Sequence, residues 1–326
     1  MPEIAYRTTG TRAAILGLGA HVPEDRLTND DLARIVDTSD AWIRQRTGIA
    51  ERRIVTPGVT TAEIALPAAR RALLAAEVLP AELDLVVLGT SSPDQQFPAT
   101  ACHLQRMLGA ERAMAVDALA ACSSWLYAAS IAERYIATGV VRRALVVGAE
   151  VMSRLIDYTD RTSCILFGDG AGAAVLGPSA TAGFDSFVLG ADGAKADLIY
   201  CGPTADDPRS RLRMDGQGTY RAATRAMEEA SLRACEVAGV SPQDVALVVP
   251  HQANARIIDA VASRLGIPLE RFALNLDRYG NTSSASIPLA LDEAVQAGRV
   301  APGDRVLLVG FGAGLTWAAT VMTWGA

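Results

Sequence analysis

One cysteine lies where a run of small residues meets the start of a helical pattern. In the stretch "DALAACSSWLYAASIAERY", Cys122 precedes apolar residues that recur at helical spacing. We predict that "ALAAC" is a buried approach strand, because it carries no charged residue, and that a helix follows it. At a helix N-terminus, unpaired backbone N–H groups lower the pKa of a thiol and make the thiolate available near pH 7. Cys122 is therefore a candidate nucleophile, although a lone cysteine is more commonly a small core residue.

Two further polar side chains stand in contexts that permit chemistry. His251, in "LVVPHQANARII", follows an apolar strand, and polar residues at the carboxyl ends of strands are typical of sites in α/β folds. A structural role for this histidine is an equally good interpretation. Asn281, in "DRYGNTSSASIPLALDEAV", lies among turn and helix-cap residues, so it becomes a chemical candidate only beside the other two. We interpret His21 as a loop residue and His103 as part of a helix.

Short apolar runs that end in glycine predict buried strands. They cover residues 12–20, 83–90, 143–150 and 305–314. Longer amphipathic runs lie between them and predict helices, the clearest at 61–78 and 220–239. Uninterrupted Val/Leu/Ile strands that alternate with helices indicate an α/β fold whose sheets are covered on both faces.

The sequence also shows internal similarity between segments that are separated by a constant spacing. Residues 70–89 resemble 232–251, and residues 144–149 resemble 306–311, in both cases 162 positions further on. A shared offset of about half the chain indicates two copies of one βαβ-rich unit.

We place the N-terminal half at residues 1–178 and the C-terminal half at 179–326, with a turn-rich junction between residues 175 and 215. A site between the halves would draw residues from both.

The glycine-rich stretch "FGDGAGAAVLG" (167–177) loosely fits a dinucleotide-binding fingerprint. That fingerprint requires a following helix, whereas "AAVLG" has the character of a strand that breaks at Gly177 and Pro178. We therefore favour a tight turn between strands over cofactor binding.

Composition excludes several classes of protein. The 326 residues are half hydrophobic and carry a net charge of −6, so no global field attracts nucleic acid or an anionic membrane. Five cysteines without CxxC spacing argue against a disulfide framework and a zinc site. No stretch approaches the ~20 apolar residues of a membrane span, and the first residues lack a signal-peptide pattern. We expect a soluble cytoplasmic protein with reduced thiols.

Long blocks of sequence, in this order, carry a family resemblance. They are residues 36–54, the cysteine helix, 160–177, 248–259, 277–295 and 310–319. Together they resemble the β-ketoacyl-acyl-carrier-protein synthase III family of the thiolase superfamily over nearly the whole chain. The resemblance implies a thiolase-like α/β fold in which two duplicated halves form a five-layered αβαβα architecture. It also implies an acyltransferase that condenses a short acyl-CoA primer with malonyl-acyl carrier protein, releases carbon dioxide and so initiates fatty acid biosynthesis.

The resemblance assigns catalytic roles by position. Cys122 would be the acyl-accepting nucleophile, and His251 and Asn281 would complete a triad. The backbone N–H groups of Cys122 and Ala313 would form the oxyanion hole, and Phe311 would shield the site. No metal and no redox cofactor is expected, because decarboxylation supplies the driving force.

The resemblance also places substrate contacts. Those for coenzyme A and its pantetheine arm fall on Trp42, Arg46, Arg161, Ala253 and Asn254. Phe97 matches a residue that crosses a dimer interface to close the partner's acyl pocket, which implies a homodimer. The other expected partners are acyl carrier protein and coenzyme A thioesters.

Carrier proteins are acidic, and Arg221, Arg256 and Arg264 are candidates for a local basic docking patch. Ordinary solvated charges are the alternative, and for Arg264 the two interpretations are equally good. After the cysteine this chain has "SSW", where many members have a small residue and then Gly-Phe, so the size of the primer stays open.

Two other functions fit the same residues less well. A relative that primes a polyketide pathway, or that only transfers acyl groups, would share the triad. A non-catalytic partner of another synthase would be expected to lack the nucleophile, which this chain retains at Cys122.

Overall fold

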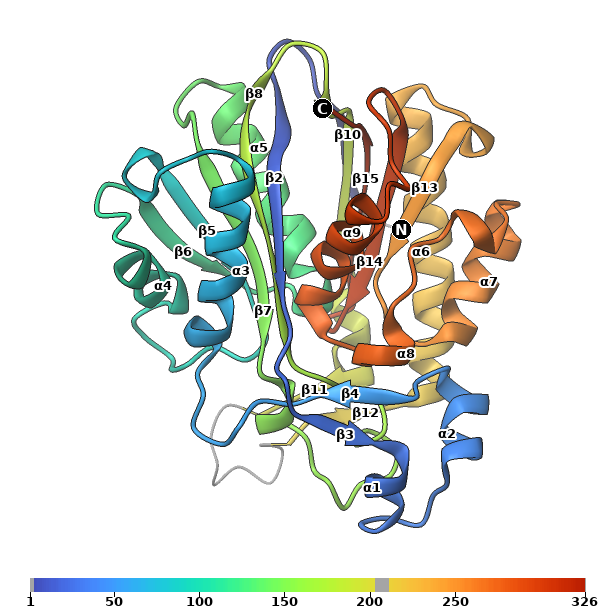
Figure 1. Ribbon diagram of the computed structural model, residues 1–326. Coiled ribbons are helices and arrows are strands. Elements are labelled where there is room, and N and C mark those ends of the chain that lie inside the picture. The colour runs from blue at the N-terminus through green and yellow to red at the C-terminus, as the bar shows by residue number, and fades with distance from the viewer. Residues whose placement is uncertain (1–2, 203–210, 326) are drawn as a thin grey trace.

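Two β-sheets form the framework of the protein, which a computed structural model describes over residues 3–202 and 211–325. The first sheet has the spatial order β2 (Arg12–His21), β8 (Gly170–Ser179), β7 (Ala144–Glu150), β5 (Leu85–Gly89) and β6 (Met114–Ala118). The second has the order β1 (Glu3–Arg7), β10 (Ser186–Ala191), β15 (Thr316–Thr323), β14 (Arg305–Gly312) and β13 (Val245–Pro250), with β9 (Gly183–Phe184) paired to β15. Figure 1 shows the two sheets standing side by side.

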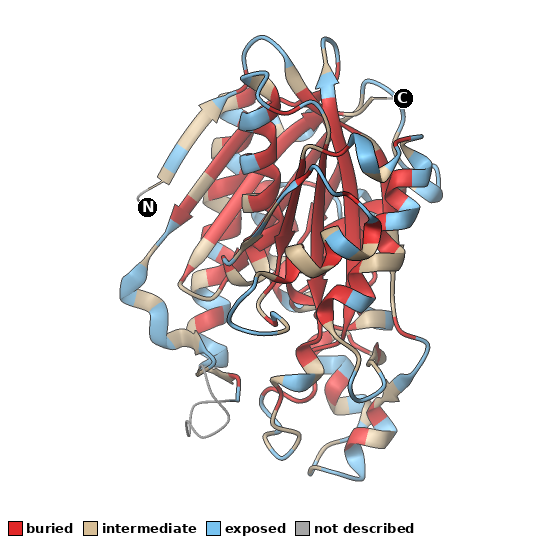
Figure 2. Ribbon diagram, turned by 90° about the vertical axis from the view of Figure 1, so that its left-hand side faces the viewer, coloured by how far each residue is buried: buried red, intermediate tan, exposed pale blue. Residues whose placement is uncertain are grey.

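Helices cover the outer face of each sheet and fill the space between them. The outer layers are α3 (Thr61–Ala75) with α4 (Thr100–Leu108), and α6 (Gly216–Ala238) with α7 (Ala255–Leu265). The middle layer is α5 (Ser124–Ala137) with α9 (Ser286–Gln296), and both helices contact strands of both sheets. The central strands are buried almost throughout, as the red ribbons of Figure 2 show, because both faces of each sheet are covered. The predicted five-layered αβαβα fold is confirmed.

Smaller elements gather beyond one end of the sheets, at the bottom of Figure 1. They include the pairs β3 (Arg26–Thr28) with β4 (Glu51–Arg53) and β11 (Ile199–Tyr200) with β12 (Arg213–Met214), and the helices α1 (Asn29–Ala33), α2 (Asp40–Thr47) and α8 (Leu276–Tyr279). Single 3-10 turns are η1 (Pro80–Glu82), η2 (Ala121–Ser123), η3 (Met152–Arg154), η4 (Gly193–Leu198), η5 (Pro242–Asp244), η6 (Leu269–Arg271) and η7 (Ser283–Ala285). Within the described ranges, no helix has the length and apolar character needed to cross a membrane.

The strand orders of the two sheets repeat one another. The run β2-β8-β7-β5 corresponds to β10-β15-β14-β13, and in both runs the first two pairings are antiparallel and the last is parallel. The constant spacing in the sequence therefore reflects a real duplication. The sheets differ at their edges, where β6 extends the first and β1 extends the second. The sequence analysis did not anticipate β1, whose side chains are only partly buried.

Two local predictions were wrong. "ALAAC" is not a buried strand, because β6 ends at Ala118 and Leu119 is 75% exposed. Apolar side chains face outward here since β6 is the edge of its sheet, so a lack of charge did not signify burial. The glycines of "GDGAGA" from Gly170 on lie inside β8 instead of forming a turn, and α9 packs closely on them. The predicted strand over "AAVLG" is confirmed.

Candidate active site

A cavity of about 690 Å³ receives residues from both halves of the chain. The predicted site residues that line it are Cys122, His251, Asn281, Phe311, Ala313, Trp42, Arg46, Ala253, Asn254, Arg221 and Arg256. Phe97, Arg161 and Arg264 are not among its described lining residues. The duplication thus brings together side chains that are far apart in the sequence.

Cys122 sits in the turn η2 between β6 and α5. The turn is tight, with Ala121 at a φ of +48°, and the Ser124 hydroxyl donates to the Ala121 carbonyl at 2.6 Å. Gly312 at the end of β14 packs against it, since a Cβ there would lie 2.7 Å from the Cys122 nitrogen. Only glycine permits this approach of the second half to the turn that carries Cys122.

The environment of Cys122 does not favour the thiolate. The residue is half-buried because part of its surface faces the cavity. Burial raises the pKa of its thiol to about 12, the nearby Ser283 hydroxyl lowers it, and the Glu150 carboxylate raises it further. The predicted lowering of the thiol pKa was therefore wrong, because removal from water outweighs the helix N-terminus. The thiol needs a proton acceptor in order to react near neutral pH.

His251 follows β13 and is fully buried. Its Nδ1 lies 2.6 Å from the Ser286 hydroxyl, whereas its Nε2 has no hydrogen-bond partner in the part of the chain that the structure describes. Burial lowers the pKa of the ring to about 3, so the imidazole is neutral at pH 7. The Phe311 ring meets it edge-on, with the ring centroids 5.5 Å apart. His251 therefore offers one neutral ring nitrogen to the cavity.

Asn281 is held by its own backbone. Its N–H donates to the Leu166 carbonyl at 2.8 Å, and its carbonyl accepts from the Gly168 N–H at 3.0 Å. Its side-chain Oδ1 accepts the Ser283 N–H at 2.8 Å. Because the oxygen is engaged by a backbone donor, the amide NH₂ is the end of the side chain that remains for a ligand.

The predicted coenzyme A residues lie together at Trp42. The guanidinium groups of Arg46 and Arg161 lie 5.7 and 5.2 Å from the centre of its ring. Arg161 also donates to the Asp37 carbonyl at 2.8 Å. An aromatic face flanked by two guanidinium groups suits an adenine ring and its phosphates.

Asn254, by contrast, has structural contacts for both ends of its side chain. Its Oδ1 caps α7 at the Arg256 N–H, 2.9 Å away, and its Nδ2 donates to the Arg46 carbonyl at 3.1 Å. Ala253 is buried and lines the cavity beside it. The structure thus brings the predicted pantetheine residues to the cavity, with Asn254 also holding α7 against α2.

The three arginines predicted for docking separate into two groups. Arg221 and Arg256 line the cavity, and Arg256 lies 5.9 Å from the ring centre of Tyr220. Arg264 instead forms an ion pair with Glu228 at 2.7 Å. Phe97 is 82% exposed on the loop between β5 and α4. Neither Arg264 nor Phe97 contacts the cavity of its own chain.

Sequence reasoning missed several residues around the triad. Ser283, which holds Asn281, was interpreted only as a helix cap, and Ser286, which contacts His251, was not considered. Glu150, a fully buried acid at the end of β7, was not considered. It follows an apolar strand just as His251 does, and that signal was sufficient to find it.

Comparisons with known proteins agree with this geometry. The family model described as 3-oxoacyl-[acyl-carrier-protein (ACP)] synthase III matches residues 116–193, and the model of its C-terminal part matches residues 235–324. The chain is 50% identical over 323 residues to a β-ketoacyl-[acyl-carrier-protein] synthase III from Roseiflexus sp. (strain RS-1), covering 96% of this chain and 98% of that one.

Solved structures give the same result. The crystal structure of β-ketoacyl-[acyl carrier protein] synthase III from Thermus thermophilus is 50% identical, with a TM-score of 0.92 over 96% of this chain and 99% of that one. The priming β-ketosynthase of the R1128 polyketide pathway is 39% identical, with a TM-score of 0.92 over 99% and 98% of the two chains. With a matching fold and sequence, this chain belongs to the 3-oxoacyl-[acyl-carrier-protein] synthase III family.

Proposed function

We propose that this chain condenses an acyl-CoA primer with malonyl-acyl carrier protein, through an acyl-Cys122 intermediate, and so initiates fatty acid biosynthesis. The product is 3-oxoacyl-acyl carrier protein. The observation that carries the proposal is the convergence of Cys122, His251 and Asn281, from opposite halves of the chain, on one cavity. A covalent intermediate divides a difficult carbon–carbon bond formation into two steps.

In the first step, sulfur of Cys122 attacks the thioester carbonyl while its proton passes to Nε2 of His251. The Ser286 hydroxyl prepares this tautomer when it donates to the Ser283 carbonyl, 2.8 Å away, and accepts the proton of His251 Nδ1. Burial disfavours each charge alone, but thiolate and imidazolium form together and stabilise one another. Coenzyme A then leaves as the thiol, carrying the proton away from the ring.

The tetrahedral intermediate of this step needs donors for its oxyanion. We assign the backbone N–H groups of Cys122 and Ala313, two residues that line the cavity. Loss of one such donor typically costs ~10²–10³ in rate.

In the second step, the malonyl thioester loses carbon dioxide. The electron pair of the broken carbon–carbon bond becomes an enolate, whose negative charge lies on the thioester oxygen. Before this step, Nε2 of His251 takes up a proton from water in the cavity and Nδ1 gives up its proton through the Ser286 hydroxyl, so the ring stays neutral but changes tautomer. The Asn281 amide and the Nε2–H of His251 then donate to that oxygen, and the Ser286 hydroxyl donates to Nδ1. The enolate carbon attacks the acyl-cysteine, and the released thiolate is protonated. The step requires no metal or redox cofactor.

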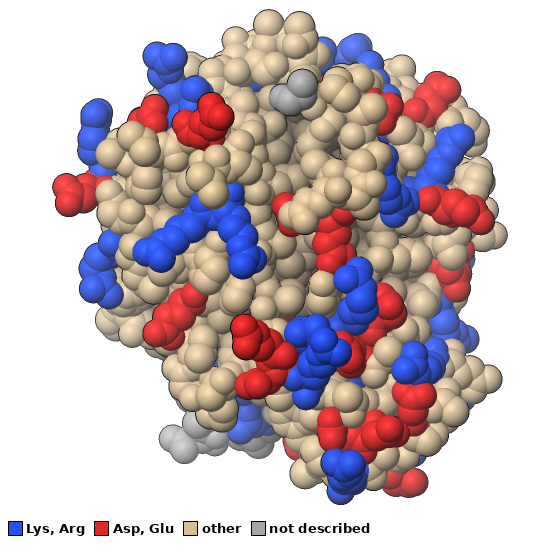
Figure 3. Space-filling view, in the orientation of Figure 1, with Lys and Arg blue, Asp and Glu red and all other residues tan. Residues whose placement is uncertain are grey.

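We assign the substrate entrance to four arginines. Arg46 and Arg161 lie around Trp42, and Arg221 and Arg256 complete the set. The face of the protein in Figure 3 mixes both signs of charge, so an acidic carrier protein would be recognised by local groups rather than by a global field. Arg264 is already neutralised by Glu228, and we leave it out of the docking patch.

We also propose that the protein forms a homodimer through the edge strand β6. Met114 and Val116 on this strand are 48% and 44% exposed, and Leu119 beyond it is 75% exposed. An unpaired strand edge with apolar side chains favours pairing with a second copy. The dimer would place Phe97 at the partner's acyl pocket.

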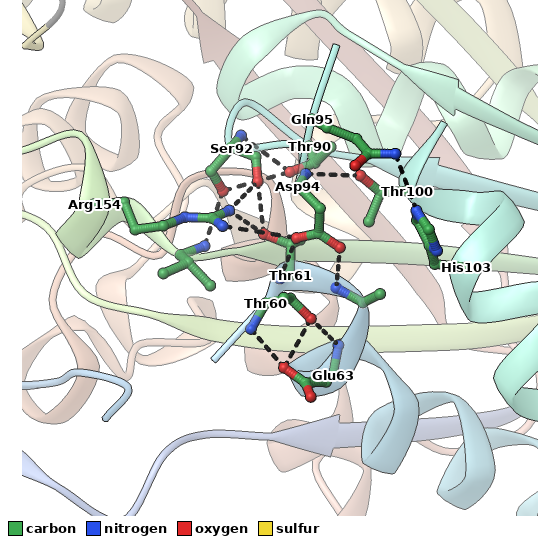
Figure 4. A network of polar contacts seen from close by, with 12 residues as sticks. Thr60, Thr61, Glu63, Thr90, Ser92, Asp94, Gln95, Thr100, His103 and Arg154 are labelled. Carbon is green, nitrogen blue, oxygen red and sulfur yellow. Dashed lines mark hydrogen bonds and ion pairs between the residues drawn. The ribbon is translucent and has the colours of Figure 1, made fainter. Parts of the chain in front are cut away.

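The base of the loop that carries Phe97 is rigidly held, as Figure 4 shows. Asp94 accepts the Thr61 N–H at 2.6 Å, and its own N–H donates to the Thr100 hydroxyl at 3.1 Å. A fixed base with an exposed aromatic tip suits insertion into a partner with little loss of conformational entropy.

Priming of a polyketide is the second candidate, because the R1128 priming ketosynthase resembles this chain over nearly its full length. Both functions use the same condensation and differ in the primer and in the carrier protein.

Intact-protein mass spectrometry tests the proposal. The protein is mixed with a panel of acyl-CoAs and then chased with malonyl-acyl carrier protein. We expect an acyl adduct on Cys122 that disappears as 3-oxoacyl-carrier protein forms, and the preferred adduct identifies the primer. An adduct that never condenses would favour simple acyl transfer, and no adduct from any acyl-CoA would refute the proposal.

A further inference from the structure

The nucleophile's turn has a structural counterpart in the second half. The turn η7 begins at Ser283, 162 positions after Ala121, and it precedes α9 as η2 precedes α5. Ala121 and Ser283 both have a φ of +48°, which few non-glycine residues adopt. Ser284 therefore occupies the position in η7 that Cys122 occupies in η2.

This second turn packs against the strand ends of the first half. The Ser284 hydroxyl donates to the Gly89 carbonyl at the end of β5, at 2.8 Å. The turn also lies directly on β7, since a Cβ on Gly148 would come within 2.3 Å of the Ser284 carbonyl oxygen. At the end of β7, the fully buried Glu150 accepts the Ser284 N–H at 3.3 Å.

Glu150 receives three further donors from the segment that follows β5. The Ser91 N–H lies 3.0 Å from both carboxylate oxygens, the Ser92 hydroxyl donates at 2.6 Å and the Thr90 hydroxyl at 3.2 Å. All four groups donate, so they fit an ionised carboxylate, which only accepts. Burial raises the pKa of Glu150, and hydrogen bonds from Ser92, Ser284 and Ser91 oppose that rise. A glutamine at position 150 would place the N–H donors of its amide against the groups that donate to Glu150.

The segment held by Glu150 is fixed from its other side as well. Figure 4 shows Arg154 donating to the Ser92 carbonyl at 2.7 Å and to the Thr61 hydroxyl at 2.8 Å. Ser92 is therefore immobilised between Glu150 and Arg154. The carboxylate rests on a rigid base, and the element whose position it can determine is η7.

That position matters for Asn281. The residue before Ser284 is Ser283, whose N–H holds the Asn281 Oδ1 at 2.8 Å. Displacement of η7 would turn the Asn281 amide away from the cavity. The turn η2 also contacts η7, where the Ser283 hydroxyl lies near the Cys122 thiol, but η2 is held in addition by Ser124 and Gly312.

We infer that Glu150 is a positioning residue for decarboxylation, because its carboxylate holds η7 so that the Asn281 amide faces the substrate. The inference rests on the proposed function of Asn281. It makes an unusual prediction, since the same charge opposes ionisation of the Cys122 thiol. Removal of the charge should slow decarboxylation and at the same time make the thiol easier to ionise.

The test compares Glu150→Gln with the wild-type protein in two assays. Release of carbon dioxide from malonyl-acyl carrier protein should fall on the order of 10²-fold, the typical cost of misplacing a reacting group by about 1 Å. Alkylation of Cys122 by iodoacetamide, followed by peptide mass spectrometry across pH 7–10, should become faster and shift to lower pH. A merely structural role would instead slow both reactions together with a loss of thermal stability.

Two variants complete the experiment. Glu150→Asp keeps the charge but shortens the reach, so we expect slow decarboxylation with an unchanged alkylation profile. Glu133→Gln is the matched control, because Glu133 is also fully buried but bonds Thr8 and Arg134, away from the cavity. It should leave both readouts unchanged.

The outcomes separate the inference from the proposed function. If the wild-type protein does not decarboxylate malonyl-carrier protein, the proposed function fails first. If the wild-type protein decarboxylates and Glu150→Gln does so at the same rate, the inference alone is refuted. If Glu150→Gln does not fold, the Glu150→Asp variant takes its place. Decarboxylation by Glu150→Asp at the wild-type rate would then refute the inference about Glu150.

Discussion

The turns η2 and η7 have the same place in their halves but opposite surroundings. Cys122 in η2 faces the substrate cavity, whereas both the N–H and the hydroxyl of Ser284 in η7 are engaged inside the protein. The residues at the facing strand ends differ in the same way. Gly312 ends β14 opposite Cys122, and Glu150, 162 positions earlier, ends β7 opposite Ser284.

The comparison explains why the two turns of a duplicated fold differ in their access to the cavity. At the first turn, glycine lets the end of β14 approach the Cys122 nitrogen closely. At the second turn, a carboxylate fills the equivalent space and satisfies the donors around it. Duplication provided two similar turns, and a glycine or a glutamate at one strand position distinguishes the turn that faces the cavity from the turn that is engaged inside the protein.

The largest effect should come from the nucleophile itself. Cys122→Ala should abolish the acyl adduct and reduce condensation by at least about 10³-fold, because no covalent intermediate can form. A second change, Ser284→Cys in the Cys122→Ala background, places a thiol in the counterpart turn and should not restore the adduct, since Glu150 occupies the space there. Intact mass after incubation with acyl-CoA measures both.

Cys235→Ala is the matched control for that pair, because Cys235 is buried in α6 and does not line the cavity. It should keep the adduct. An adduct on the cysteine at position 284 would show that the two turns are chemically equivalent and would contradict the comparison.

Asn281 should separate the two half-reactions. Asn281→Ala removes a donor to the enolate, so decarboxylation of malonyl-carrier protein should fall about 10²–10³-fold. Acylation of Cys122 should change by less than about 10-fold, because the proposed oxyanion donors of that step are backbone groups. Single-turnover release of coenzyme A and release of carbon dioxide measure the two steps. Equal losses in both would remove Asn281 from its assigned role.

The two close-approach glycines test the supports of the turns. A methyl group at Gly312 would meet the Cys122 nitrogen at 2.7 Å, and one at Gly148 would meet the Ser284 carbonyl at 2.3 Å. Each alanine variant should lower the free energy of unfolding by about 1–3 kcal/mol through overpacking. Gly312→Ala should mainly slow acylation, and Gly148→Ala should mainly slow decarboxylation.

Urea unfolding measures the change in the free energy of unfolding, and the two half-reaction assays measure the rates of acylation and decarboxylation. The reverse pattern, with Gly148→Ala slowing acylation more than decarboxylation, would show that η7 does not act through Asn281.

Much of this arrangement could be predicted from local sequence. Runs of Val, Leu and Ile predicted the buried strands, and the constant spacing of 162 revealed the duplication. Cys122 and His251 were found because each follows an apolar segment and begins a polar one. These features depend on residues that are neighbours in the chain.

The features that were missed depend on contacts between the halves. The pKa of Cys122 rises because the packed fold removes the thiol from water, which the helix pattern around it does not encode. The equivalence of η2 and η7 was missed because "ACS" and "SSA" differ while their backbones agree. Glu150 acquires its role only when η7 of the other half lies on β7.

His251 gives the most specific expected effect, on stability instead of rate. Its pKa is lowered by burial to about 3 in the folded protein, below the ordinary value of 6.5. At a pH between these two pKa values, His251 is therefore protonated in the unfolded chain but not in the folded protein. The stability contributed by the neutral ring is complete above pH 6.5 and is lost as the pH falls, by up to about 1.4 kcal/mol per pH unit for one proton.

Urea unfolding of the wild-type protein and of His251→Asn between pH 7 and 4 measures this contribution. Asparagine does not titrate. The free energy of unfolding of the His251→Asn variant should therefore fall less steeply with decreasing pH than that of the wild-type protein, whatever the two values are at pH 7. Other groups that titrate in this range are common to both proteins and cancel in the difference. Parallel curves would mean that His251 takes up its proton as readily in the folded protein as in the unfolded chain, and burial would then not lower its pKa.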